Sequence, residues 1–318
     1  MQRIFLIGLT ALLTACANQP SQQAQGDNKA VLSPVTTYYD YQFASAEGEP
    51  IALNQLPSAL IDADVVLIGE WHTHSAVHRF QTDFLKARLA DSKDVALSME
   101  QFTRQHQNVI DDYLAGEIGE QVLMSDAAAW PNYQSDYRPL VELAKSQGID
   151  IIAANAPKPV VQCIGRNGID YLEKLTPEER QWIADDVNTS DSPYKEKFMA
   201  SMHHGTPEQT EKQFAAQVTW DETMADSIVK YLDENPDKQV IHVAGKFHTE
   251  QGLGTAASIL RRNADLNIVV ITPVESLSDS SEDYQLQVLS PPTRYVKQEN
   301  RMKAYKKLSH RGKGLECK

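Results

Sequence analysis

Two stretches decide the fold: Val65-Val66-Leu67-Ile68-Gly69-Glu70-Trp71-His72 and, far downstream, Val240-Ile241-His242-Val243-Ala244-Gly245-Lys246-Phe247-His248. Each is an apolar run of strand length that stops at a glycine and brings a histidine three residues further on. Short apolar runs of this kind are typical of strands buried on both faces, as in a parallel sheet covered by helices. In such sheets ligands bind at the carboxyl ends of the strands. We therefore expect both Gly-x-x-His turns to open onto the same edge of one sheet.

Strand and helix signals alternate along the rest of the chain. Beyond the two stretches, strands are predicted at residues 95–99, 150–154 and 267–272, an edge strand at 285–289, and a small hairpin at 41–53. Residues 160–235 carry no strand signal and are interpreted as a helical insertion covering one edge of the sheet. This order predicts an α/β fold, a mostly parallel β-sheet flanked by helices, over residues 37–290.

The N-terminus predicts export and a lipid anchor. An apolar run from Ile4 to Leu13 follows Met1-Gln2-Arg3, the pattern of a secretory signal, and it is shorter than the ~18–20 apolar residues of a membrane span. Leu13-Thr14-Ala15-Cys16 resembles a bacterial lipobox, so residues 1–15 are interpreted as a signal peptide and Cys16 as the lipidated residue. Because Ala17 follows, the resemblance implies the outer membrane, on its periplasmic face. Residues 16–36 are expected to be a flexible tether.

Charge is distributed unevenly. From Thr293 onward there are nine Lys or Arg residues against Glu299 and Glu316, a net charge of +7, so the remainder of the chain carries −20 of the total of −13. An acidic body argues against nucleic acid as a partner. The basic tail, residues 291–318, is interpreted as a solvated, frayed terminus, with contact to acidic lipid headgroups as the alternative.

Cysteine use is sparse for an exported chain. Cys163 and Cys317 are the only cysteines besides Cys16. A disulfide framework is therefore not expected to hold the domain together. One bridge between the two is allowed but is not indicated by the sequence.

Polar side chains follow four of the predicted strands: Glu70 with His72, Glu100, Asn155, and His248. The strand-end rule predicts that they converge on one cleft. Two carboxylates and two imidazoles gathered there can hold a divalent metal with an open position for water. Alternatively, they can run acid–base chemistry without metal. Each residue alone has a structural explanation, but polar groups seldom end four buried strands by accident.

Further histidines lie outside this set. His74 and His78 are spaced i,i+4 on the helix after the first strand and share a face; they are interpreted as exposed helix histidines, with metal ligation as the alternative. His203 and His204 lie in the helical insertion, where a loop is expected. His242 is mid-strand and is expected to be a hydrogen-bonded core residue.

Four motifs resemble the ChaN-like family of haem-binding lipoproteins. They are Ile68-Gly69-Glu70-Trp71-His72, the run 153–157, the run 216–225, and Ala244-Gly245-Lys246-Phe247-His248. The resemblance spans about residues 40–290. Relatives of this family, the Tiki-type proteases and erythromycin esterase-like proteins, use paired Gly-x-x-His turns and a glutamate for hydrolysis, with metal in the Tiki case. Matched residue by residue, these are Gly69 and His72, Gly245 and His248, and Glu100.

The resemblance implies haem binding during iron uptake, with a tyrosine on the iron and two haems stacked in a homodimer. Tyr133 and Tyr137 are the candidate ligands, in a segment at 130–139 that resembles the aromatic loop of the family. A phenolate suits ferric iron, and Trp130 offers a face for the apolar macrocycle; the alternative is that both tyrosines are ordinary half-buried aromatics. Candidates for the haem propionates are Lys158, Arg166, His203 and His204.

Two functions thus remain open at the level of sequence. The first is an outer-membrane lipoprotein that binds haem, with a haem uptake receptor as its partner. The second is a hydrolase, esterase-like or metallopeptidase-like, that uses Glu70, His72, Glu100 and His248 with or without a divalent metal. A structural envelope lipoprotein with a vestigial cleft is the third alternative.

Overall fold

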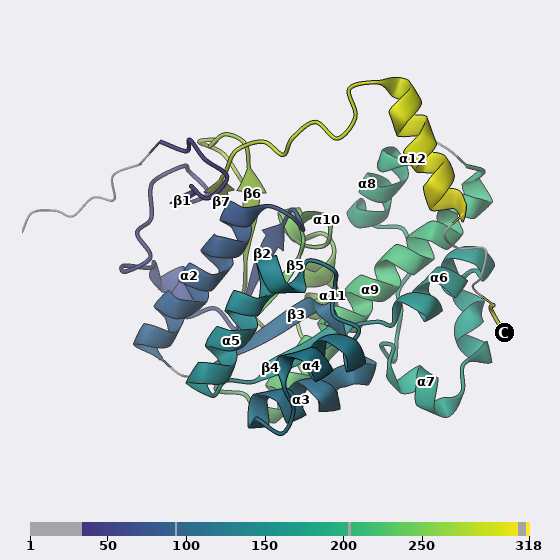
Figure 1. The fold of residues 1–318 in the computed structure, drawn as a ribbon, viewed down its shortest axis with the longest axis horizontal. Helices are drawn as coiled ribbons and strands as arrows, with labels where there is room; N and C mark the ends of the chain where they lie inside the picture. The colour runs from purple at the N-terminus through teal and green to yellow at the C-terminus, as the bar shows by residue number, and fades with distance from the viewer. Residues whose placement is uncertain (1–33, 93, 203–204, 311–315) are drawn as a thin grey trace, which may run out of the picture.

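The computed structural model describes residues 34–92, 94–202, 205–310 and 316–318 (Figure 1). Its strands form one seven-stranded sheet in the order β1-β7-β6-β2-β5-β3-β4. Every neighbouring pair is parallel except β1 with β7. The strands are β1 (Gln42–Ala44), β2 (Val65–Glu70), β3 (Val95–Thr103), β4 (Ile151–Asn155), β5 (Gln239–Gly245), β6 (Ile268–Val274) and β7 (Tyr284–Gln287). The predicted α/β fold with a mostly parallel sheet is confirmed.

The two decisive stretches become β2 and β5, which lie side by side at the centre of the sheet. Their pairing runs in parallel from Val65 opposite Val240 to Glu70 opposite Gly245. All residues of both strands are buried, because both faces of a central parallel strand are covered. Their Gly-x-x-His turns therefore leave the sheet next to each other, at the same end.

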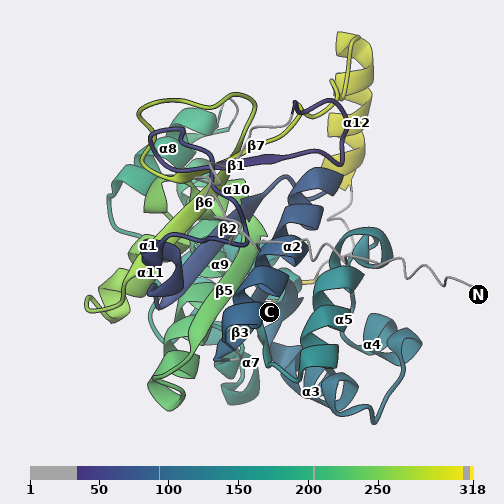
Figure 2. The same cartoon turned by 90° about the vertical axis from the view of Figure 1, so that its left-hand side faces the viewer.

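Helices cover both faces of the sheet (Figure 2). On one face, α2 (Ser75–Asp91) and α5 (Arg138–Gln147) bury Phe80 and Leu140 against Ile68 and Met99. On the other, α9 (Pro207–Glu234) and α11 (Thr255–Arg262) bury apolar side chains against β2 and β5. The remaining helices are α1 (Ser58–Ile61), η1 (Arg104–His106), α3 (Gln107–Ala115), α4 (Glu120–Asp126), η2 (Tyr133–Tyr137), α6 (Lys158–Asn167), η3 (Ile169–Lys174), α7 (Pro177–Gln181), α8 (Pro193–Ser201), α10 (Lys246–Thr249), η4 (Glu250–Gly252) and α12 (Gln298–His310). No helix in the described part of the chain is both long and apolar enough to cross a membrane.

The helical insertion covers more of the sheet than predicted. Residues 160–202 and 205–235 hold no strand, as expected. Helix α9 packs at the β4 edge, where the Ser227 hydroxyl donates to the Ala154 carbonyl (2.9 Å), and it also extends over a face, because Met224 and Ile228 pack in one cluster with Leu67 and Val240. This packing places Gln217 and Asp221 of α9 near the carboxyl ends of the strands.

The predicted small hairpin at 41–53 is present in a minimal form. An antiparallel bridge between Ala44 and Pro50 joins its two arms, with backbone hydrogen bonds from Ile51 to Phe43 and from Ser45 to Glu49, both of 2.8 Å. Its first arm, β1, also pairs with β7, so the prediction that β7 is an edge strand is wrong. Burial favours this pairing, because Phe43 packs against Phe80 and Tyr284.

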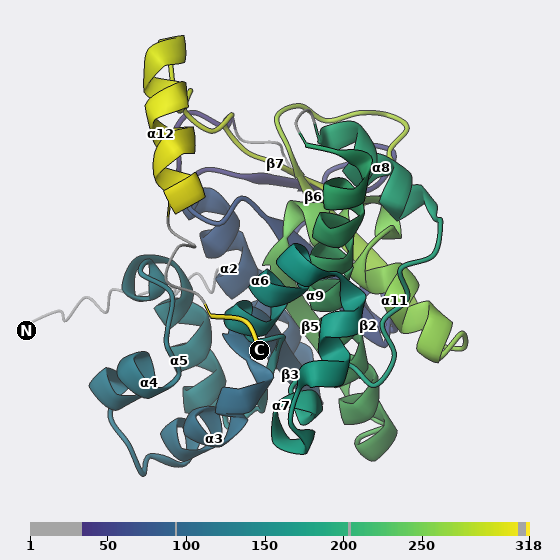
Figure 3. The same cartoon turned by 90° about the vertical axis from the view of Figure 1, so that its right-hand side faces the viewer.

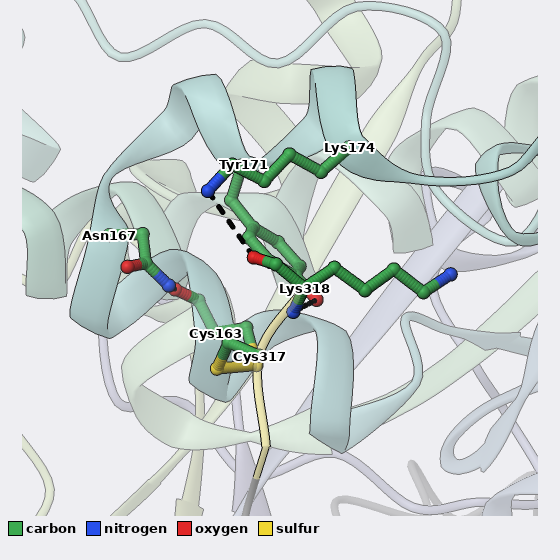
Figure 4. Close-up of a disulfide and its surroundings, with 6 residues drawn as sticks. All are labelled: Cys163, Asn167, Tyr171, Lys174, Cys317 and Lys318. Carbon is green, nitrogen blue, oxygen red and sulfur yellow. Dashed lines mark hydrogen bonds between the residues drawn. A yellow bond between two sulfur atoms is a disulfide. The ribbon is translucent and has the colours of Figure 1, made fainter.

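The C-terminus is fixed to the body of the protein. Cys317 forms a disulfide with Cys163 of α6, with 5.6 Å between their Cα atoms (Figure 4). Lys318 donates its N–H to the Tyr171 hydroxyl (3.4 Å) and accepts a hydrogen bond from the Lys174 ammonium (3.2 Å). The prediction of a frayed terminus is therefore wrong at residues 316–318, because a bridge across 154 residues leaves no local sequence signal.

Candidate functional site

A cavity of about 830 Å³ lies at the carboxyl ends of β2 and β5, and we call it the strand-end cleft. It is lined by both Gly-x-x-His turns, by Gln217 of α9, and by Pro291–Arg294, the segment that follows β7. Its volume falls within the ~300–1,000 Å³ typical of small-molecule and cofactor pockets. The position agrees with the strand-end rule for parallel sheets.

Glu70 ends β2 at the floor of the cleft and is only 1% exposed. Its two carboxylate oxygens accept hydrogen bonds from the Tyr137 hydroxyl (2.7 Å), His72 Nδ1 (2.8 Å), Gln81 Nε2 (2.8 Å) and Gln101 Nε2 (3.1 Å). Burial alone would raise the pKa of Glu70. The hydrogen bond from His72, the charges of His78 and His72, and the bond from Gln81 outweigh it and lower the pKa to about 2. Glu70 is therefore a fixed negative charge.

His72 is oriented by Glu70. Because its Nδ1 donates to the carboxylate, the neutral ring carries its lone pair on Nε2. The side chain is 43% exposed and lines the cleft. A Cβ at position 245 would lie 2.8 Å from Nε2, so Gly245 is needed for the ring to lie over the end of β5. Burial lowers the pKa of His72, but the bond to Glu70 and the charge of Glu100 outweigh it, so the pKa is raised.

Glu100 and His248 meet on the β5 side of the cleft. Glu100 Oε2 accepts the N–H of Gly245 (2.6 Å), and Glu100 Oε1 lies 3.9 Å from His248 Nε2. His248 Nδ1 donates to Asp221 of α9 (2.9 Å). Burial would lower the pKa of His248, but the charge and hydrogen bond of Asp221 and the charge of Glu100 raise it to about 9. His248 is thus an imidazolium at neutral pH.

Asp221 was not identified from the sequence. It is fully buried and also accepts hydrogen bonds from the hydroxyls of Tyr194 (2.8 Å) and Thr255 (2.9 Å). It lies within the run 216–225 that carries the family resemblance. An acidic residue on the buried side of an otherwise apolar helix face was the available signal.

Asn155 supports the site without lining it. Its Nδ2 donates to the backbone oxygen of Glu100 (2.9 Å), and its Oδ1 accepts the N–H of Ala156 (2.8 Å). The first contact joins β4 to β3 at the level of the site, and the second fixes the Asn155 side chain against the residue that follows it. Asn155 is therefore a positioning residue for Glu100.

The donors of the cleft do not form a metal site. In the part of the chain that the structure describes, no group of three or more His, Cys, Asp or Glu side chains is placed to hold a metal ion. Glu70 is occupied by four hydrogen-bond donors, and His248 is held by Asp221. The predicted divalent metal is therefore unsupported.

His74 and His78 are buried, which corrects their interpretation as exposed helix histidines. His74 Nε2 lies 2.9 Å from the oxygen of Leu289, and His78 Nδ1 lies 3.0 Å from Gln81 Oε1. His78 belongs to the first turn of α2 and His74 is the residue just before that helix. Both face inward because this end of α2 packs against the sheet. Each thus has a structural partner. His242 is buried in β5 as expected, with Nδ1 2.9 Å from the Ser98 hydroxyl.

The candidate haem ligands lie beneath the cleft. Tyr133 and Tyr137 belong to η2, a short π-helix, and both rings are buried. Burial is the largest cause of a raised pKa in each phenol. Trp130 is half-buried, with its ring centroid 5.1 Å from that of His72, and Asn132 donates to the His72 carbonyl (2.7 Å). The segment 130–137 therefore supports the His72 turn from below.

The remaining predicted residues lie elsewhere. Lys158 and Arg166 are exposed on α6 and are not among the residues that line the cleft. His203, His204 and Cys16 lie outside the described residues. Lys246 and Arg294, which do line the cleft, were not singled out from the sequence. Lys246 belongs to the second Gly-x-x-His turn, so its position in that motif was the available signal.

Glu70 should stabilise the fold in a pH-dependent way. Its pKa falls from 4.5 to about 2 on folding, so its contribution is complete above pH 4.5 and is lost as the pH falls toward 2. Glu70→Gln should lower the free energy of unfolding by ~2–4 kcal/mol at pH 7 and flatten its dependence on pH in that window. Urea unfolding at a series of pH values measures both. The exposed Glu173→Gln is the matched control; identical profiles for the two variants would contradict the role of Glu70.

Comparison with known proteins places this geometry in a family. The model of a family described as haem-binding uptake, Tiki superfamily, ChaN matches residues 56–259. The solved structure of ChaN of Campylobacter jejuni with cofacial haem has a similar fold, with a TM-score of 0.63 and 18% identity, covering 81% of this chain and 100% of that one. An erythromycin esterase, EreC, in its open conformation gives a TM-score of 0.42 at 10% identity over 84% of this chain and 86% of its own.

Among curated proteins, Protein RETICULATA-RELATED 5, chloroplastic, of Arabidopsis thaliana is 25% identical over 241 residues, or 69% of this chain. This chain spans about a third of the length of that relative. The family match, in contrast, covers more than half of the chain and includes both Gly-x-x-His turns. The chain therefore belongs to the haem-binding ChaN family of the Tiki superfamily.

Proposed function

We propose that this chain binds haem in the strand-end cleft, in the service of haem uptake. The family match over residues 56–259 carries the proposal. The lining of the cleft supports it: Trp71, Phe247 and Tyr38 offer aromatic surface for a flat apolar macrocycle, and Lys246 and Arg294 offer positive charge for its carboxylates. Haem, when bound, would supply the iron that is taken up.

We propose Tyr137 as the iron ligand. Its hydroxyl lies 3.4 Å from the His72 carbonyl and is held by Glu70, directly below the cleft. Ligation requires η2 to rearrange, because the ring is buried and its hydroxyl is engaged. A π-helix is rare and is frequently found at functional sites, which favours η2 as the segment that moves. Tyr133 is the less suitable candidate, since its ring packs against Phe102 in the core.

A hemin titration tests both parts of this proposal. Wild-type protein should give a tyrosinate-type ferric spectrum, Tyr137→Phe should lose it, and Tyr231→Phe should keep it, because the Tyr231 hydroxyl binds Asp150 on another surface. Circular dichroism checks that the variants fold. A spectrum that survives in Tyr137→Phe but is lost in His72→Ala would make the exposed imidazole the ligand. Failure of wild-type protein to bind hemin would overturn haem binding itself.

We further propose that the protein is a lipoprotein of the outer membrane, facing the periplasm, that acts as a homodimer and delivers haem to or from an uptake receptor. The N-terminal pattern ending at Cys16 supports the anchor. Radioactive palmitate should label wild-type protein in cells and should not label Cys16→Ala, with Cys317→Ala as the control that keeps Cys16. Equal labelling of wild type and Cys16→Ala would rule out this anchor.

A second candidate function is hydrolysis in the same cleft. The observation that favours it is the pair of Asp221 and His248 facing Glu100, since an imidazole oriented by a buried carboxylate is suited to acid–base chemistry. With a pKa of about 9, His248 starts protonated and would act as a proton donor or anion holder. We expect ester hydrolysis that declines as the pH rises through about 9 and that is lost in His248→Gln but kept in His106→Gln. Absence of turnover by wild type on ester and peptide panels would exclude this candidate.

A further inference from the structure

The segment from Tyr295 to Lys307 has a surface that neither proposed function uses. Figures 1 and 3 show α12 standing at the periphery of the molecule, after a connection that crosses over the end of the sheet. Its exposed large apolar side chains are Tyr295 (46% exposed), Val296 (91%), Met302 (44%) and Tyr305 (55%). Interspersed with them or directly after them are the exposed basic residues Lys297, Arg301, Lys303, Lys306 and Lys307. We call these nine residues the tail surface.

Helix α12 is an unusual element energetically. A 13-residue helix is marginal in water on its own, and helices of globular proteins are normally stabilised by burying an apolar stripe. Among the described side chains at 298–307 none is buried, and Ala304 alone is half-buried. Met302 and Tyr305 share one face and, with Gln298 and Arg301, line a hollow of about 490 Å³. The segment therefore exposes apolar surface, chiefly at Val296 and Met302.

The charge of the tail identifies the chemistry of that partner. Residues 293–318 carry +7, whereas the remainder of the chain carries −20. A basic helix with aromatic and aliphatic side chains is suited to an anionic lipid surface, where the apolar groups enter the headgroup region and each Lys or Arg near the surface adds to the electrostatic attraction. An acidic protein would complement the charges, but it gives no comparable place for exposed Val296, Met302 and the two tyrosines.

We propose that the tail surface docks onto a membrane of anionic phospholipid. The chain is attached to the body of the protein on both sides of the tail surface. Before it, the Tyr38 hydroxyl donates to the oxygen of Ser290 (3.1 Å); after it, Cys317 is bonded to Cys163. Docking would thus fix the orientation of the whole domain, including the strand-end cleft, part of whose lining is Pro291–Arg294. The proposal does not depend on haem binding or on lipidation of Cys16.

Vesicle sedimentation tests it. A chain that begins at Ala17, without the expected signal and lipidated cysteine, is mixed with vesicles of phosphatidylcholine alone or of phosphatidylcholine with phosphatidylglycerol. We expect binding only to the second kind, weakened by added salt. Lys303→Glu/Lys307→Glu and, separately, Val296→Asp/Met302→Asp should each reduce binding at least about tenfold. The control Arg79→Glu/Lys86→Glu reverses two exposed charges on α2 and should bind as wild type.

Three results would overturn the proposal. They are equal binding to neutral vesicles, wild-type binding by the Lys303→Glu/Lys307→Glu variant, and loss of binding in the α2 control. Sedimentation velocity is run in parallel on the same proteins. Self-association that is lost in Lys303→Glu/Lys307→Glu, without vesicle binding, would show instead that the acidic body of a second copy covers the tail surface.

Discussion

The parallel pairing of β2 with β5 is the constraint on which the rest of the site depends. Glu70 lies opposite Gly245, so the two turns start level with each other and their histidines are delivered to one edge. A shift of one residue would send every side chain of a strand to the opposite face of the sheet. Because both strands are buried on both faces, side-chain pattern alone does not set this register. With the observed pairing, the His72 ring lies so close to Gly245 that a side chain at position 245 would displace it.

The two glutamates of the site have separate tasks. Glu70 is enclosed by side-chain donors from α2, β3 and η2, so it organises the turn of His72 and the segment beneath it. Glu100 instead accepts a backbone N–H from the end of β5 and faces the imidazolium of His248. Glu70 therefore stabilises the local structure, while Glu100 faces His248, which lines the strand-end cleft. The two glutamates differ in role because different groups donate hydrogen bonds to their carboxylate oxygens.

Much of this arrangement could be predicted from sequence, and the failures have physical causes. Buried strands show as apolar runs, so β2, β5 and the site residues Glu70, Glu100 and His248 were found directly, although β3 continues past Glu100 to Thr103. Asp221 and the donors Gln81 and Gln101 were not, because their roles depend on how elements dock. The pairing of β1 with β7 was not predicted, because local turn signals say nothing about a strand that is distant in sequence. The Cys163–Cys317 bridge was not indicated by the sequence for the same reason, because no local pattern encodes a contact between residues so far apart.

The disulfide has a mechanical consequence for the tail. A segment joined only to β7 would transmit any pull on α12 to that strand, which pairs with β1 over three residues and with β6 over four. With its far end bonded to α6, the same pull divides between the sheet and the packed helices α6 and α9. Peeling of this segment from its far end would have to break or bypass the covalent bond between Cys317 and α6. The chain between β7 and Cys317 is thus attached to the domain at both ends, so tension on it would be shared between two anchoring points.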